Sequence, residues 1–226
     1  GGSNLTETAT NAVRIGGISG YTQGSPTNSI NNGKITIYGT RNANGTIGNA
    51  GNDYKNGSYV IAGIVGYKTE GKITDCQNHG DIVIEGTFKE LHATNKTQWK
   101  IAGIACYLST DLVGNNVADG EIIISGTIEG EADIAGMVAF HYNSISAETS
   151  ATNITIKKGA VLSGGAIIGG VVSWTFMSLS DLTYTGTITI EEGATIGTKC
   201  YIGGCVGAHI GASDKARTIT CTNNGT

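Results

Sequence analysis

The chain has 226 residues, of which 36 are glycine and one is proline, and its formal net charge at pH 7 is −4. Only 14% of the residues are charged, so the sequence supplies no positive field for nucleic acid, and we expect no nucleic-acid partner. The longest apolar run, residues 166–172, is far shorter than the ~18 residues of a membrane-spanning helix, so we expect no transmembrane segment.

A short apolar phrase that begins with isoleucine recurs six times along the chain. Its second copy reads Ile-Ala-Gly-Ile-Val-Gly-Tyr, and the copies start at residues 15, 61, 101, 134, 168 and 202. A repeat of 33–46 residues is typical of stacked structural units that are each too small to bury their own apolar face. Because the repeat extends almost from end to end, we interpret residues 1–226 as a single repeat domain.

Within the phrase, both faces of the expected strand are apolar, and one position is glycine in all six copies. In the second copy, Ile61 and Val65 would lie on one face, whereas Ile64 would lie on the other. Such a strand is either buried on both sides or kinked at the glycine two residues after the leading isoleucine, for which Gly63 is the example. In either case, something should cover its outer face.

A second phrase of alternating isoleucines follows each apolar phrase after a variable loop. Residues 35–37, 82–84, 122–124, 154–156 and 188–190 have the period-2 pattern of a strand with one buried face. A third, shorter strand is expected near residues 46–48, 127–130, 160–164 and 194–197. About three short strands per repeat, without a helical pattern, predict an all-β parallel β-solenoid of about six coils, the last one incomplete. The extra residues of the longer first repeats, 41–58 and 88–98, should form loops at the rim.

The five cysteines have no metal-ligand spacing. Cys106 and Cys205 occupy columns that hold small or aliphatic residues in the other copies, so we expect them to be buried thiols. Cys76 and Cys221 occupy equivalent places several coils apart, which makes a bridge between them improbable. If a disulfide forms, Cys200 and Cys205 are the pair that is close in sequence, provided that the strand bends between them.

The second copy of the apolar phrase, followed by Lys72-Ile-Thr-Asp-Cys-Gln-Asn-His-Gly-Asp-Ile82, resembles the GLUG-type repeat of bacterial surface and secreted proteins. Residues 219–225 repeat the Cys-x-Asn-x-Gly turn of this motif, whereas the fourth and fifth repeats lack it. The resemblance implies a β-solenoid at the bacterial cell surface or outside the cell, with an adhesive or scaffolding role. It brings no catalytic residues with it.

No cluster of side chains predicts a reaction, a metal site or a cofactor site. The four histidines are scattered singly, and neither a zinc-peptidase motif nor a nucleophile elbow occurs. Glu129, Glu131 and Asp133 alternate, so an extended backbone would place the three carboxylates on one face. They could serve glycoside cleavage or hold a cation, but a solvated strand edge explains them as well.

One column of the apolar phrase is aromatic in five of its six copies, and we take it as the candidate ligand-binding site. The column contains Tyr21, Tyr67, Tyr107, Phe140 and Trp174. Stacked in register, the rings would form a ladder with a spacing of about 4.8 Å. If the ladder faces outward it could contact a sugar or a protein, and if it faces inward it is simply core.

From these features we expect a non-enzymatic adhesive or scaffolding segment that binds an extracellular protein or glycan. The alternative is a carbohydrate-active or purely carbohydrate-binding β-solenoid. The end of the chain repeats a turn that precedes an Ile-x-Ile strand. An open solenoid end exposes unpaired backbone groups, so we expect the C-terminal end to pair with another chain or with a further segment.

Overall fold

Each apolar phrase folds into two short strands separated by a bend at its glycine. The computed structural model describes residues 12–39, 58–88, 98–143, 145–210 and 219–226. The strands before the bend form sheet A, and those after it form sheet B. Sheet A contains β1 (Ala12–Gly16), β5 (Ser58–Ala62), β10 (Gln98–Ala102), β16 (Glu131–Ala135), β22 (Ala166–Gly169) and β27 (Cys200–Gly203). Sheet B contains β2 (Ser19–Thr22), β6 (Val65–Lys68), β11 (Ala105–Leu108), β17 (Val138–His141), β23 (Val172–Thr175) and β28 (Val206–His209).

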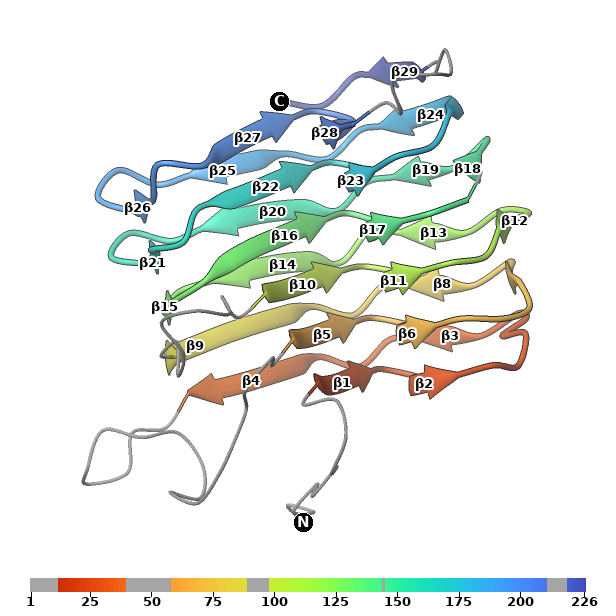
Figure 1. The fold of residues 1–226 in the computed structure, drawn as a ribbon, viewed down its shortest axis with the longest axis horizontal. Coiled ribbons are helices and arrows are strands. Elements are labelled where there is room, and N and C mark those ends of the chain that lie inside the picture. Colours follow the sequence, from red (N-terminus) through yellow and green to blue (C-terminus); the bar gives the residue numbers. More distant parts are fainter. Residues whose placement is uncertain (1–11, 40–57, 89–97, 144, 211–218) are drawn as a thin grey trace.

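The rest of each coil returns along a second layer, formed by sheets C and D, whose strands run in the opposite direction to those of sheets A and B (Figure 1). Sheet C contains β3 (Ile30–Asn31), β7 (Ile73–Thr74), β8 (Gln77–Asn78), β12 (Leu112–Val113), β13 (Val117–Ala118), β18 (Ile145–Ser146), β19 (Thr149–Ser150), β24 (Leu179–Tyr184) and β29 (Ile219–Asn223). Sheet D contains β4 (Ile35–Gly39), β9 (Ile82–Phe88), β14 (Glu121–Ile124), β15 (Thr127–Ile128), β20 (Asn153–Ile156), β21 (Val161–Leu162), β25 (Ile188–Ile190) and β26 (Thr195–Ile196).

All strand pairs are parallel, and equivalent residues of successive repeats lie side by side. Ile61, Ile101 and Ile134, for example, are direct partners in sheet A. The chain is therefore an all-β parallel β-solenoid with three to four strands per coil, as the repeat predicts. The third strand of each repeat is present as β15, β21 and β26, whereas its expected copy at residues 46–48 lies outside the described residues, as do most of the two long insertions.

The bend at the glycine explains why no other residue occupies this position. The apolar phrase is kinked there, and in the central coils its strands are also buried on both faces, so both alternatives apply. A Cβ added at Gly63 would lie 2.1 Å from Cγ of Asn78 in the opposite layer and 2.3 Å from the carbonyl oxygen of Gly103 in the next coil. The layer formed by sheets A and B thus bends inward at the glycine and contacts sheet C. Asn78 uses this position to accept a hydrogen bond of 2.7 Å from Nδ2 of Asn31 and to donate one to the Gly80 carbonyl.

Because the layers touch at the glycines, the interior consists of two apolar compartments. One lies between sheets A and D and is filled by residues such as Ile61, Ile101 and Ile122, all at most 1% exposed. The other lies between sheets B and C and contains Ile64 and Leu112. Sheet C was not predicted as strands: its residues were interpreted as variable loops and turns. Most of its strands have only two residues, which is too short for a periodic pattern to be recognised.

Candidate functional site

The five predicted aromatic residues lie together on the outer side of sheet B. In β6, Val65 belongs to the interior compartment between sheets B and C, whereas Tyr67 packs against a separate outer cluster that includes Val60 and Cys106. The register brings the five rings into one column. Their exposure varies from 45% at Tyr21 to 5% at Phe140. The column is therefore not interior core, and its own rings cover the outer face of the apolar strand.

The central rings of the column cover each other's faces. Tyr67 and Tyr107 are stacked with ring centroids 4.4 Å apart, and Tyr107 and Phe140 are stacked at 5.3 Å. Phe140 meets Trp174 edge-on at 4.8 Å. A ring that is covered on both faces by neighbouring rings presents only its edge to a ligand, so these central positions cannot stack on a sugar ring in the usual way.

A second aromatic row, which was not predicted from the sequence, extends this surface. Tyr142 lies two residues after Phe140, and Phe176 lies two residues after Trp174. Tyr142 and Phe176 stack at 5.6 Å, and Tyr142 is 44% exposed. The signal in the sequence was the pattern aromatic-x-aromatic in two successive repeats. We call the complete surface the aromatic strip; it contains Tyr21, Tyr67, Tyr107, Phe140, Tyr142, Trp174 and Phe176.

Positive side chains from the outer face of sheet A lie against the aromatic strip. The guanidinium carbon of Arg14 is 4.6 Å from the ring centroid of Tyr67 and 5.2 Å from that of Tyr21. The ammonium group of Lys100 lies 5.1 Å from the ring centroid of Phe140. Both are cation–π contacts, which hold the rings in place.

Two of the three alternating carboxylates do share a face, and both are engaged in ion pairs. Asp133 contacts Lys100 at 2.7 Å, and the side chains of this pair are only 4% and 6% exposed. Glu131 contacts Lys199 at 2.7 Å. Glu129 lies before β16, in the turn that follows β15. Burial raises the pKa of Asp133, while the neighbouring Lys100 opposes that shift. The Asp133–Lys100 pair fills the angle between sheets A and B beneath the aromatic strip.

A buried carboxylic acid, which was not predicted from the sequence, lies inside the compartment between sheets B and C. Glu148 is fully buried and accepts a hydrogen bond of 3.0 Å from Asn116, whose own Oδ1 accepts the Cys76 backbone N–H at 2.9 Å. Burial raises the pKa of Glu148 to about 8, so the group is mainly protonated at neutral pH. Burial also lowers the pKa of His141, to about 4. Both groups lie in the core rather than at the surface.

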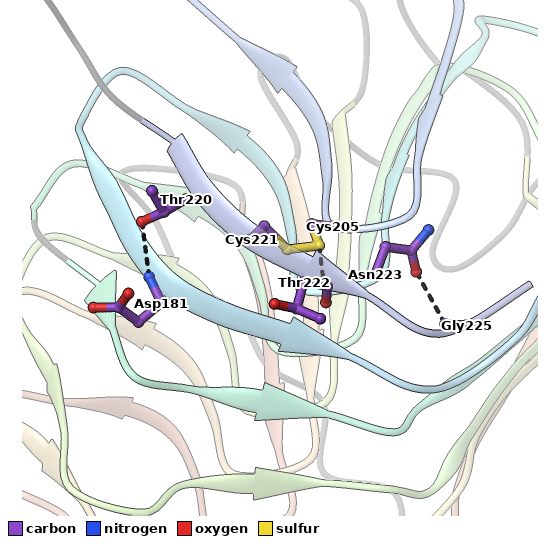
Figure 2. Close-up of a disulfide and its surroundings, with 7 residues drawn as sticks. All are labelled: Asp181, Cys205, Thr220, Cys221, Thr222, Asn223 and Gly225. Carbon is purple, nitrogen blue, oxygen red and sulfur yellow. Dashed lines mark hydrogen bonds between the residues drawn. A yellow bond between two sulfur atoms is a disulfide. The ribbon is translucent and has the colours of Figure 1, made fainter.

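Cys205 and Cys221 form a disulfide (Figure 2). Cys205 is therefore not the buried free thiol that was expected, and its partner is Cys221 rather than Cys200. Their columns face each other across the compartment between sheets B and C: in the preceding coil, Val171 and Leu182 occupy the same two places. Pairing depends on this spatial opposition, which spacing in the sequence does not reveal. Cys76 and Cys106 are buried free thiols, as expected for Cys106, and Cys200 is free and exposed. A disulfide indicates an oxidising environment.

In the parts of the chain that the structure describes, no three His, Cys, Asp or Glu side chains come together as a metal site. The same residues include no helix that is long and apolar enough to cross a membrane. Compared with family models, curated proteins and solved structures, the chain matches none of them.

Proposed function

We propose that this chain is a non-enzymatic adhesive or scaffolding segment of a bacterial surface or secreted protein, and that the aromatic strip is its contact surface for a protein partner. The observation that carries the proposal is the outward position of the strip, which extends over five consecutive coils. Aromatic side chains grouped on a surface supply most of the binding free energy in many protein interfaces.

Four further features support this function. The resemblance of the second repeat to GLUG-type repeats implies an adhesive or scaffolding role outside the cytoplasm, and the disulfide fits an oxidising compartment. The carboxylate of Asp133 is buried and held in an ion pair with Lys100, which speaks against a role of this carboxylate in glycoside cleavage. The mutual covering of the central rings favours a protein over a glycan, since a sugar needs an open ring face.

The proposal is tested by binding of the full chain to immobilised extracellular matrix proteins and, in parallel, to a glycan array. Tyr142→Ser removes the most exposed ring of the second aromatic row. Tyr38→Ser is the matched control, because Tyr38 is 65% exposed and lies on β4 in the opposite layer. We expect Tyr142→Ser to weaken protein binding about tenfold or more, and Tyr38→Ser to leave it unchanged.

Equal binding by the two variants would refute the role of the strip. An intact chain that binds no protein in the panel would count against adhesion, and binding to glycans alone would favour the carbohydrate-binding alternative. Unchanged thermal midpoints establish that both variants are folded.

A further inference from the structure

Tyr67 and Tyr107 hold two phenol rings face to face on successive coils. They are direct partners in the parallel ladder of β6 and β11, so their side chains leave the backbone in the same direction. Their ring centroids are 4.4 Å apart, and the ring planes differ by only 8°. Because the rings are nearly parallel and related by the repeat, the carbons beside the hydroxyl of one ring (its ortho carbons) face those of the other.

The neighbouring tyrosines of the aromatic strip lack this alignment. Tyr21 lies 6.0 Å from Tyr67 with an angle of 30° between the planes. Tyr142 lies 5.7 Å from Tyr107 with an angle of 58°. The rings of Tyr67 and Tyr107 are partly exposed, so a small oxidant can reach both of them. Burial raises the pKa of Tyr107, and the nearby hydroxyls of Tyr67 and Tyr142 add to this rise, which places the hydroxyl ends of the stacked pair together.

We propose that Tyr67 and Tyr107 form a site of oxidative modification, at which hydrogen peroxide and a peroxidase join the two rings into a dityrosine. Each phenol gives up one electron and its hydroxyl proton, and the peroxide takes up both electrons and both protons to become two molecules of water. The two phenoxyl radicals then form a carbon–carbon bond between facing ortho carbons. The hydrogens of these carbons move to the two oxygens as the rings become aromatic again, so the product has two hydrogens fewer than the two tyrosines.

The stacked geometry favours coupling within one molecule. Two radicals held on adjacent strands meet at a far higher effective concentration than radicals on separate molecules do. The new bond would link the second coil to the third and close the chain between them into a loop, which restricts the unfolded chain as a disulfide does. The Cys205–Cys221 disulfide indicates an oxidising environment, in which such a reaction is compatible with the rest of the chain.

The test treats the full chain, in dilute solution, with hydrogen peroxide and a haem peroxidase. The monomer is then isolated, its dityrosine fluorescence is measured, and its reduced peptides are analysed by mass spectrometry. A dityrosine removes two hydrogens, whereas oxidation of methionine or cysteine adds oxygen, so the masses distinguish these products. We expect one main pair of linked peptides, which contains Tyr67 and Tyr107, and a yield that does not depend on protein concentration.

Phenylalanine variants separate the stacked pair from its neighbours. Tyr67→Phe and Tyr107→Phe keep the ring but remove the hydroxyl that forms the radical, so each should lower the dityrosine fluorescence of the monomer about tenfold or more. Tyr21→Phe and Tyr142→Phe are the matched controls, because these rings contact the same pair without the parallel alignment. They should leave the signal unchanged, and circular dichroism establishes that all four variants are folded.

A monomer without dityrosine, or links between separate molecules only, would overturn the proposal. A signal that survives Tyr67→Phe, or a dityrosine that contains Tyr21 or Tyr142, would do the same. The outcome does not depend on the proposed binding function of the aromatic strip, because the reaction needs no protein partner of the adhesive kind.

Discussion

Replacement of Gly103 by alanine tests whether contact between the two layers determines the glycine of the apolar phrase. An added Cβ would lie 2.1 Å from the carbonyl oxygen of Gly136 in the next coil and 2.8 Å from Cβ of Ala118 in sheet C. Ordinary contact begins near 3.4 Å, so a backbone that is held on both sides would have to shift by more than an ångström. The shift would also weaken the hydrogen bond of 3.1 Å from the Gly103 N–H to that carbonyl.

We expect Gly103→Ala to lower the free energy of unfolding by about 3 kcal/mol, at the upper end of the usual cost of overpacking, because the clash is with backbone. For a chain of this length, that corresponds to a thermal midpoint lower by about 6–12 °C in circular dichroism or calorimetry. Gly204→Ala is the matched control. In the last coil the three atoms nearest to an added Cβ all belong to the side chain of Asn223, the closest at 2.2 Å, and that side chain can move.

The control should therefore cost less than about 1 kcal/mol. A midpoint for Gly103→Ala within 1 °C of the unaltered protein would refute the reasoning. Equal losses for Gly103→Ala and Gly204→Ala would also refute it, since the next coil's carbonyl would then not be the cause.

Three further predictions concern the disulfide, the buried acid and the buried ion pair. Cys221→Ser should destabilise the protein by about 3 kcal/mol, because the Cys205–Cys221 bridge closes a loop with a sequence separation of 16 residues; an identical thermal midpoint under oxidising conditions would contradict this. The raised pKa of Glu148, about 8, means that the folded state holds a proton that the unfolded state releases, so stability should fall as the pH rises from about 4.5 to about 8. Glu148→Gln should make urea unfolding less dependent on pH in that window, and an unchanged dependence would exclude Glu148 as its source. Asp133→Asn should cost about 3 kcal/mol by leaving Lys100 buried and unpaired, whereas Lys100→Met combined with Asp133→Leu should recover most of the loss; a single variant as stable as the wild type would show that the pair contributes little.

The candidate site was predictable in its residues but not in its surroundings. Alignment of the copies identified Tyr67 and its equivalents as one column, because in-register stacking turns a repeated position into a line of neighbours. The same alignment could not assign the column to the interior or the exterior. That depends on the bend at Gly63, which sends the two halves of the phrase into different sheets. Tyr142 was missed because only two repeats carry an aromatic residue at that position.

The sequence by itself determined the architecture: a repeated apolar phrase and alternating isoleucines are sufficient for a parallel solenoid, because both are local periodic signals. Only the tertiary structure decided which columns face each other across a coil. It placed Cys205 opposite Cys221, Lys100 beside Asp133, and Glu148 in the core. These contacts depend on where each coil bends and how closely the two layers approach. Those distances are set by packing of the whole coil, which spacing along the chain does not encode.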